Sequence, residues 1–362
     1  MASPIIGGNV TNLAKNFVPQ VWLRWVTDHS TRTNRFLNSG VATSSDELTG
    51  ILGQPGNGLH VTIPHIHSVD LSLPVQDWNN QTDLFANGIN SYTEEEIKFT
   101  DAQMFGSSDY DDYLTGAPTL DAISQQFAEY WANIDEKRMI QVVNAAFLNQ
   151  NIATAKGVNI GNAKMFDPGD VVLAMGRMGD VNGANPSTIA VNSGTYAFMR
   201  KQNLIEYLRP SDGGTPIATY QGMAILQDDD IPLAADGTTT AYIFAPNALV
   251  YSTATAPNGI ATVRDETHQG GITGIKHERI SIAHVYGTSA DLSTGASPEN
   301  WKAALADSKT PIYKPVSDDA LRQIRIIKYD FKITPEFVVP GVNSPLQTSG
   351  STTSSQVQTN RK

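Results

Sequence analysis

The sequence contains no cysteine, so disulfide bonds and thiolate chemistry are excluded. No stretch of it approaches the ~20 consecutive apolar residues that a membrane-spanning helix needs. The first residues lack a basic segment followed by an apolar core, so we expect no secretory signal peptide. The sequence therefore favours neither an oxidising compartment nor a membrane partner.

Basic residues are scarce over a long part of the 362-residue chain. The net charge of −11 speaks against general nucleic-acid binding. Between Phe36 and Glu136 the only Lys or Arg is Lys98, whereas residues 1–35 carry Asp28 as the only acidic residue against four basic ones, Lys15, Arg24, Arg32 and Arg35. Segments with such an excess of one charge are predicted to contact partners of opposite charge. For any single run of acidic residues, the alternative is a face exposed to solvent.

Sequence motifs of catalysis are also missing. Gly213-Gly214 and Gly270-Gly271 are not followed by the Lys-Ser or Lys-Thr of a phosphate loop, and Asn192-Ser193-Gly194 lacks the nucleophile-elbow pattern. We interpret the run 228–230, three aspartates, as a turn at the end of a strand, with cation binding or acid-base chemistry as the alternative. We therefore predict no enzyme and no cofactor, although sequence order leaves open a triad assembled in space.

A strand pattern is clearest over residues 59–73. Its odd positions are apolar except for His65 and His67, and a second extended segment over 90–100 completes a predicted long hairpin. Two histidines at this spacing could bind one metal ion, but no third ligand is evident, so packing or hydrogen bonding is the favoured interpretation and we predict no metal site. Because an isolated two-stranded ribbon is marginally stable, we expect this hairpin to lie on a neighbouring molecule.

A long helix is predicted over residues 119–150. Thr119 is its candidate N-cap, Asp121 suits its first turn, and apolar residues recur at helical spacing. About thirty residues would span roughly 45 Å, which is long for one compact domain. The apolar stripe shifts sideways near Asp135 to Arg138, so the helical pattern is interrupted there.

The remainder of the chain alternates short helices and strands, which predicts the α+β class. Helices are expected over 168–178, where Asp167-Pro168-Gly169 is the start signal, and over 193–202, with Ser193 as its cap. Strands are expected over 186–191, 217–226, 241–244, 279–286 and 327–333. On the strand over 279–286, His284 shares one face with apolar residues.

This order of elements resembles the major capsid proteins of tailed phages, which have the Hong Kong ninety-seven type capsid fold. Several short motifs agree with it in order along the chain. They are the segment 188–193 with the following helix, Tyr220-Gln221-Gly222 leading through an apolar strand into Asp228 and Pro232, the segments 263–266 and 270–271, His284-Val285-Tyr286-Gly287-Thr288, and Pro298-Glu299-Asn300-Trp301-Lys302.

The resemblance implies an α+β capsid fold with six parts. They are an N-terminal arm (1–58), an extended hairpin or E-loop (59–105), a linker with the long spine helix (106–164), an A-domain (165–260), P-domain strands (261–340) and a flexible tail (341–362). Some relatives begin with a removable scaffolding segment. Because the arm starts almost at Met1 here, a separate scaffolding protein is expected.

The resemblance also implies a function. The protein is expected to assemble with itself into hexamers and pentamers of an icosahedral shell that encloses double-stranded DNA, in the virion, after assembly in the host cytoplasm. Scaffolding and portal proteins are the expected partners, with a decoration protein as a further candidate, and no membrane is expected. Subunit contacts are expected at Glu94, Glu95, Glu96, Trp78, Lys137 and Arg138, and contacts to interior DNA at Lys15, Arg24, Arg32 and Arg35. Because Lys98 lies near the base of the hairpin, we do not expect the covalent crosslink that some relatives form.

Two alternatives stay open from the sequence. A nanocompartment shell of the encapsulin type would have the same fold and enclose a cargo enzyme. A secreted hydrolase or carbohydrate-binding module is suggested by the many Gly, Asn, Thr and Trp residues, although the missing signal peptide and cysteines count against secretion.

Overall fold

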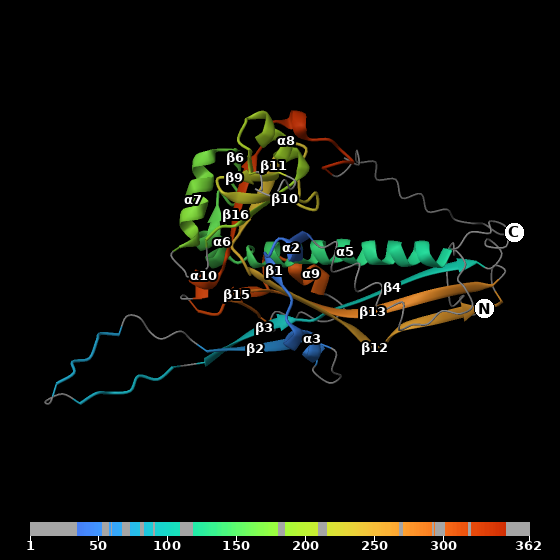
Figure 1. The fold of residues 1–362 in the computed structure, drawn as a ribbon, viewed down its shortest axis with the longest axis horizontal. Coiled ribbons are helices and arrows are strands. Elements are labelled where there is room, and N and C mark those ends of the chain that lie inside the picture. The colour runs from blue at the N-terminus through green and yellow to red at the C-terminus, as the bar shows by residue number, and fades with distance from the viewer. Residues whose placement is uncertain are drawn as a thin grey trace.

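The computed structural model describes residues 35–52, 58, 60–66, 73–79, 83–89, 91–108, 119–179, 185–208, 216–267, 271–291, 293, 301–317 and 320–344. A long helix lies between an elongated sheet on one side and a compact sheet with its own helices on the other (Figure 1). The α+β class that the sequence predicts is confirmed. Among the described helices, none is long and apolar enough to cross a membrane.

The elongated sheet is built from strands that are far apart in sequence. Its order is β1 (Ala42–Thr43), β12 (Leu249–Asp265), β13 (Ile272–Val285) and β4 (Phe99–Ser108). β13 pairs antiparallel with both β12 and β4, and the register between β12 and β13 shifts between Thr255 and Ile260, as at a β-bulge. β1 follows α2 (Arg35–Asn38) and pairs parallel with β12, and α3 (Asp46–Leu52) contacts the same strand.

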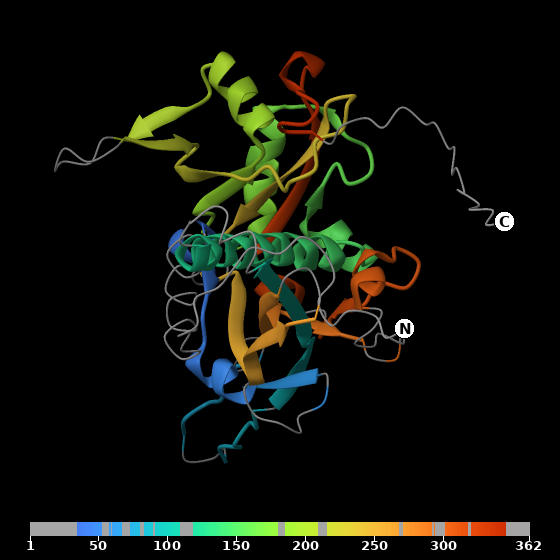
Figure 2. The same cartoon turned by 90° about the vertical axis from the view of Figure 1, so that its right-hand side faces the viewer.

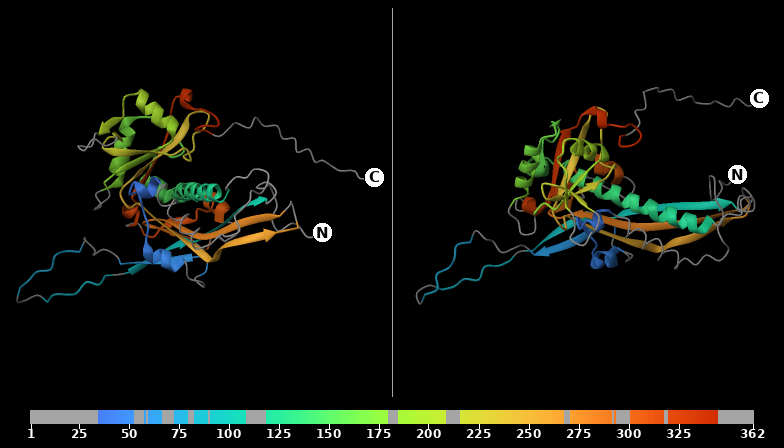
Figure 3. Two further views of the ribbon diagram at one scale, coloured as in Figure 1. Left: turned by 45° about the vertical axis from the view of Figure 1, so that its right-hand side comes forward. Right: turned by 45° about the horizontal axis from the view of Figure 1, so that its top comes forward.

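Helix α5 (Thr119–Ala146) runs along this sheet (Figures 1 and 3). Phe127 and Trp131 form a buried cluster with Ile275 of β13, and further along the helix Met139 and Val143 enter the main core. At the predicted break of the apolar stripe, Asp135, Glu136 and Arg138 are buried. The stripe is interrupted because buried ion pairs replace apolar contacts there, as described below. The helix ends at Ala146, earlier than expected, and Asn149 caps α6 (Gln150–Lys156) by accepting a hydrogen bond from the backbone N of Asn151.

The compact sheet lies on the other side of α5 (Figure 2). Its strand order is β5 (Gly157–Val158), β16 (Ile326–Lys332), β11 (Thr238–Phe244), β7 (Thr188–Val191), β10 (Met223–Gln227), β9 (Ile217–Tyr220) and β8 (Glu206–Leu208), and β6 (Lys164–Met165) also pairs with β16. Helices α7 (Pro168–Met178) and α8 (Ser193–Lys201) contribute Val171 and Phe198 to its core.

Most of these elements lie where the sequence predicts them, but the predicted cap of α8 and one predicted strand were wrong. Asp167 caps α7 as expected, but the cap of α8 is Asn192 rather than Ser193, because the Asn192 side chain accepts the bond from the backbone N of Thr195. The expected strand over 217–226 is a hairpin of β9 and β10. Its turn holds Gln221 and Gly222 at φ 48° and 81°, a conformation that a continuous strand does not allow.

The chain crosses between the two sheets more than once. β12 begins at Leu249 in the elongated sheet, so the expected A-domain boundary at residue 260 falls inside this strand. β16, expected with the P-domain strands, lies between β5 and β11 in the compact sheet. Its apolar residues Ile327, Tyr329 and Phe331 pack into the core of that sheet.

The predicted hairpin is formed by β2 (His60–Ile66) and β3 (Ser91–Ile97). The described part of β2 reaches Ile66, and residues 67–72 of the expected strand, with His67 among them, lie outside the described residues. Smaller elements complete the fold: β14 (Thr288–Ala290), α9 (Trp301–Ala306), β15 (Tyr313–Pro315), α10 (Ala320–Gln323) and η2 (Pro335–Phe337). Of the expected tail, residues 341–344 are described and form a turn.

Candidate assembly site

The loop between β2 and β3 projects away from the body of the protein (Figures 1 and 3). We call its described residues, 73–79 and 83–89, the projecting loop. Its large apolar side chains are exposed, with Val75 98%, Trp78 93% and Phe85 74% accessible. The Gln76 side chain joins its two arms, donating to the carbonyl of Phe85 and accepting from its backbone N, both at 2.8 Å.

These exposures are unusual for a soluble monomer. Burying one large apolar side chain contributes about 1.5–3 kcal/mol, and clustered exposed apolar residues mark interaction surfaces. No other part of the described chain covers the projecting loop in Figure 1. The loop is therefore a candidate contact surface for another protein molecule.

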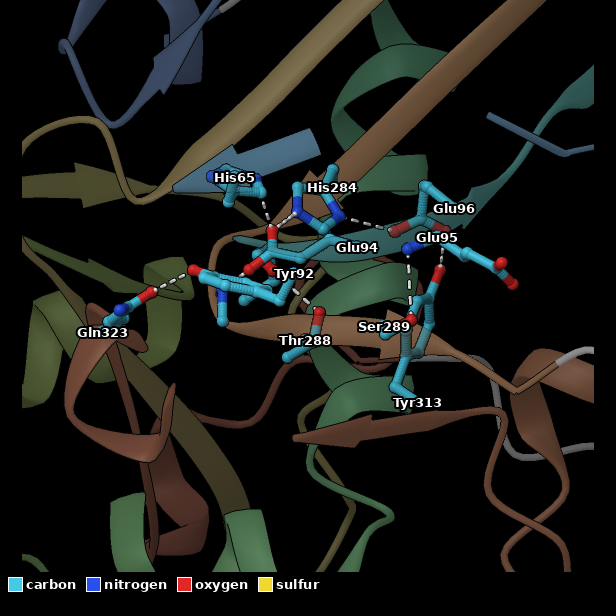
Figure 4. A network of polar contacts seen from close by, with 12 residues as sticks. His65, Tyr92, Glu94, Glu95, Glu96, His284, Thr288, Ser289, Tyr313 and Gln323 are labelled. Carbon is cyan, nitrogen blue, oxygen red and sulfur yellow. Dashed lines mark hydrogen bonds and ion pairs between the residues drawn. The ribbon is translucent and has the colours of Figure 1, made fainter. Parts of the chain in front are cut away.

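The base of the same hairpin is held by buried charges (Figure 4). His284 of β13 lies between Glu94 and Glu96 of β3, with Nε2 2.6 Å from Glu94 Oε2 and Nδ1 3.1 Å from Glu96 Oε2. Tyr313 of β15 donates to Glu96 Oε1 at 2.6 Å, and the backbone N of Gly287 donates to Glu94 Oε1 at 3.1 Å. We call Glu94, Glu96, His284 and Tyr313 the hairpin anchor; all four side chains are buried.

Further contacts surround the hairpin anchor. His65 of β2 stacks on Tyr92, and its Nε2 lies 3.1 Å from Glu94 Oε2. The Tyr92 hydroxyl donates to Gln323 of α10 at 2.9 Å, and the backbone N of Glu95 donates to Ser289 of β14 at 3.1 Å. The hairpin is thus attached to β13, β14, β15 and α10, which fixes the direction in which the projecting loop leaves the body (Figure 4).

The electrostatics of the hairpin anchor favour a protonated imidazole. Burial lowers the pKa of His284, but hydrogen bonds to Glu94 and Glu96 and their charges outweigh it and raise the pKa from 6.5 to about 9. The imidazolium then donates from both ring nitrogens, one to each carboxylate. Burial, followed by the nearby Glu96 charge, raises the pKa of Tyr313, which keeps its hydroxyl protonated as a donor.

A second set of buried charges holds α5 on the elongated sheet. Asp135 pairs with Arg279 of β13 and accepts from the Tyr251 hydroxyl at 2.6 Å, while the Arg279 guanidinium lies 4.0 Å from the centre of the Trp131 ring. Arg138 pairs with Asp101 of β4 at 2.9 Å. These pairs join the helix to both neighbouring strands at the point where its apolar stripe is interrupted.

The basic residues that were expected to face DNA lie mostly outside the described part. Of Lys15, Arg24, Arg32 and Arg35, only Arg35 is described. Its guanidinium Nη2 lies 2.7 Å from Glu136 Oε2 and 3.6 Å from Asp228 Oδ1. Arg35 is therefore engaged within its own chain, at the junction of α2 with α5.

The residues expected at subunit contacts divide into exposed and buried ones. Trp78 and Lys137 are exposed, whereas Glu94, Glu96 and Arg138 are buried and paired inside the chain, and Glu95 is partly exposed. The physical reason is the strand geometry: residues 94 and 96 share the face of β3 that points to the body, and residue 95 points the other way. Sequence analysis did not identify the partners of these glutamates. The one indication was His284, a polar residue on the otherwise apolar face of residues 279–286.

Other polar clusters give no catalytic or metal constellation. In the part of the chain that the structure describes, no group of three or more His, Asp or Glu residues is arranged to hold a metal ion. At the end of β10, Asp228 is buried, and this burial raises its pKa to about 6; its Oδ1 accepts from the backbone N of Asp230. Asp229 accepts from the backbone N of Ser193. The run of aspartates therefore organises a turn.

Comparison with known proteins shows what this chain is similar to. No model of a protein family matches it. The chain is 25% identical over 339 residues to the major capsid protein of Bacillus phage SPP1, an alignment that covers 89% of this chain and 98% of that protein. Over nearly its whole length the chain is therefore similar to the major capsid protein of a phage. That relative is a structural protein of a bacteriophage and not an enzyme.

Solved capsid structures are also similar to this chain. The capsid of Ralstonia phage GP4 is 10% identical with a TM-score of 0.49, covering 78% of this chain and 91% of that one. The Cyanophage Pam1 capsid is likewise 10% identical with a TM-score of 0.49, covering 92% and 98%.

Proposed function

We propose that this protein is the major capsid protein of a tailed phage and assembles into hexamers and pentamers of a closed icosahedral shell that encloses double-stranded DNA. The observation that supports this most directly is the projecting loop, whose apolar side chains are exposed while its base is fixed by buried hydrogen bonds. A loop that is held firmly at its base and left uncovered at its tip is suited to lie on a neighbouring copy.

The geometry of such a contact favours rings. The loop of one copy would contact a different surface on the next copy, which is a heterologous contact. Heterologous contacts form closed rings when the rotation between copies closes, and a shell needs rings of five and six. Each contact must also be modest, because a subunit that binds too tightly in a wrong place cannot be corrected during assembly.

The N-terminal segment is the proposed contact to DNA. Lys15, Arg24 and Arg32 outnumber the single acidic Asp28 in residues 1–34, and contacts of this kind to phosphates would be unspecific and salt-dependent. Arg35 is a weaker candidate than its sequence position suggested, since Glu136 and Asp228 already neutralise it.

Further partners and the place of assembly follow from the proposed function. We propose a separate scaffolding protein to direct shell closure, a portal for DNA entry and assembly in the host cytoplasm before the shell becomes part of the virion. A decoration protein on the outer surface is an additional proposed partner.

Electron microscopy of the expressed protein, alone and with a scaffolding protein encoded beside it, tests the proposal. Closed shells, sheets or six-fold rings are the expected products, and deletion of residues 74–88 should abolish them. Nuclease-protected DNA inside shells purified from infected cells would separate a DNA-containing capsid from a nanocompartment with a protein cargo. A protein that stays monomeric under both conditions, or normal shells from the deletion variant, would contradict the proposal.

A further inference from the structure

Four Asn-Gly pairs occur in the sequence, at residues 57–58, 87–88, 182–183 and 258–259. An asparagine in such a pair can be modified by its own chain, because the backbone N of the glycine can attack the side-chain amide carbon. Glycine favours this attack, since it has no Cβ to hinder the approach and its backbone adopts conformations closed to other residues. The structure describes both residues of the pairs at 87–88 and 258–259, and their surroundings differ.

The pair Asn87-Gly88 lies in the projecting loop. Residues 83–89 belong to no helix or strand, and Asn87 and Gly88 are both exposed. A Cβ placed on Gly88 would meet no atom within 4 Å, so the glycine has space to turn its backbone N toward the asparagine side chain. Among the described residues, neither the Asn87 side chain nor the backbone N of Gly88 has a hydrogen-bond partner that must first be released.

The pair Asn258-Gly259 is held in the opposite way. It lies on β12, where the register with β13 shifts between Thr255 and Ile260, and Gly259 is buried. A Cβ on Gly259 would lie 2.7 Å from the carbonyl oxygen of Ala256, closer than such atoms approach in proteins. Because the backbone has no space to rotate there, we expect the same dipeptide to stay intact in the folded protein.

An aspartate before glycine can close the same ring, but Asp236-Gly237 is protected by hydrogen bonds. The backbone N of Gly237 donates to the carbonyl of Ala234 at 2.9 Å, so it is not free to attack. Hydrogen bonds from Lys332 and Thr238 lower the pKa of Asp236 to about 2, which keeps its carboxylate ionised and unreactive toward a nucleophile. Of these three described pairs, Asn87-Gly88 alone combines exposure, space and a free backbone N.

We infer that Asn87 is a modification site, at which the backbone of Gly88 converts the asparagine to aspartate and isoaspartate. In the first step the backbone N of Gly88 bonds to Cγ of Asn87, and the side-chain nitrogen leaves as ammonia with the proton from the Gly88 N. Water then opens the five-membered imide at either of its carbonyl carbons. Water is the one co-reactant, so the reaction requires no enzyme and no oxidant.

The modification changes both the charge and the length of the projecting loop. It adds a carboxylate to a segment that already carries Asp77 and Asp83, and residues 67–90 contain no Lys or Arg to neutralise it. Isoaspartate also inserts one methylene into the main chain, two residues after Phe85, whose backbone is held by Gln76 through two hydrogen bonds of 2.8 Å. We therefore expect modified subunits to assemble less well. This consequence rests on the proposed function, whereas the chemistry itself needs no shell.

Mass spectrometry of aged, unassembled full-length protein tests the inference. The protein is kept folded at mildly alkaline pH, where loss of the amide proton speeds the attack, and is then digested with chymotrypsin. The fragment that contains Asn87 should gain the mass of an amide-to-acid conversion and become a substrate for an isoaspartate methyltransferase, while Asn258 stays unchanged. Gly88→Ala, which hinders the attack, and Asn87→Gln, which requires a larger ring, should each remove most of the gain.

Urea-unfolded protein is the matched control for the role of the fold. Unfolding removes the packing around Gly259, so Asn258 should then react about as fast as Asn87. An Asn87 that keeps its amide in the folded protein, or an Asn258 that reacts equally fast there, would overturn the inference. An Asn258 that stays slow in urea would also count against it, because local sequence would then explain the difference.

The consequence for assembly is measured separately. After ageing, the protein concentration needed for assembly should rise for the unmodified protein and stay constant for N87Q. An equal rise in both proteins would show that the modification of Asn87 does not impair assembly. If fresh protein forms no shells while Asn87 is converted as expected, the proposed function fails and the modification site stands.

Discussion

His284 and Glu94 form a buried pair that joins the hairpin to the elongated sheet. Nε2 of His284 lies 2.6 Å from Glu94 Oε2, and both side chains are inaccessible to solvent. Because Glu94 is on β3 and His284 is on β13, this pair holds the base of the hairpin in a fixed position on the elongated sheet. Predictions about the loop therefore begin with these two residues.

Replacing His284 by Gln should destabilise the unassembled protein strongly. The substitution leaves Glu94 and Glu96 buried without a counterion, and breaking a buried pair in this way costs about 3–5 kcal/mol. Chemical denaturation measures the change in the free energy of unfolding. The control is Lys314→Ala, which removes a surface pair with Asp291 and should cost less than about 1 kcal/mol. Equal effects of the two substitutions would refute the role assigned to the hairpin anchor.

The stability of the protein should depend on alkaline pH through His284. Its pKa is raised from 6.5 to about 9, so its stabilising contribution is fully present below pH 6.5 and is lost as the pH rises through about 9. A shift of this size corresponds to about 3 kcal/mol. The hydroxyls of Tyr92, Tyr286 and Tyr313 face the same region, and burial raises their pKa above the ordinary value of 10, so they stay neutral in this window.

Urea denaturation at intervals from pH 6 to pH 10, on the unmodified protein and on H284Q, checks this dependence. The difference in unfolding free energy between the two proteins should shrink as the pH rises toward 10. A difference that stays constant over the whole interval would show that His284 is neutral in the folded protein.

Much of the local structure could be predicted from the sequence. α5 begins at Thr119 and Asp167 caps α7, as expected, because the signals that start a helix act over a few residues. The place of β16 in the compact sheet could not be predicted, since pairing with β5 and β11 depends on residues far away in sequence. The end of α5 was also missed, because Asn149 caps the next helix instead of continuing this one.

The candidate site was predictable only in part. The hairpin and its exposed Trp78 follow from alternation and from the lack of apolar residues on its second strand. The burial of Glu94 and Glu96 did not follow, because three consecutive acidic residues are usually solvated. Strand periodicity alone places residues 94 and 96 on one face, but their partner His284 lies 190 residues from Glu94 and could be matched to it only in three dimensions.

Replacing Val75, Trp78 and Phe85 together by Ser should prevent assembly without affecting the fold. These side chains are exposed in the single chain, and exposed substitutions usually change stability by less than about 0.5 kcal/mol. If a shell contact buries these side chains, each substitution removes about 1.5–3 kcal/mol of stabilisation from that contact. The protein concentration needed for assembly should then rise at least about tenfold. Light scattering against concentration measures this threshold, and thermal unfolding measures the fold.

The matched control for the loop replaces Val172 and Leu173 of α7 by Ser, which removes exposed apolar residues elsewhere. Its assembly threshold should stay close to that of the unmodified protein. An equal rise of the threshold in both variants would indicate a general solubility effect instead of a loop contact.

Reversing the charge of Lys137 should weaken assembly, and a second reversal on the loop should restore it. In Lys137→Glu the exposed carboxylate on α5 repels Asp77 and Asp83 in the loop of a neighbouring copy, so the assembly threshold rises; in the triple variant K137E/D77K/D83K attraction returns and the threshold falls again. Because added salt screens exposed charges, the defect of K137E should shrink at high ionic strength. Lys201→Glu, which disrupts a surface pair with Glu336 on the compact part, is the control and should leave the threshold unchanged. If the loop reversals deepen the defect of K137E instead of correcting it, the loop does not contact Lys137 of a neighbouring copy.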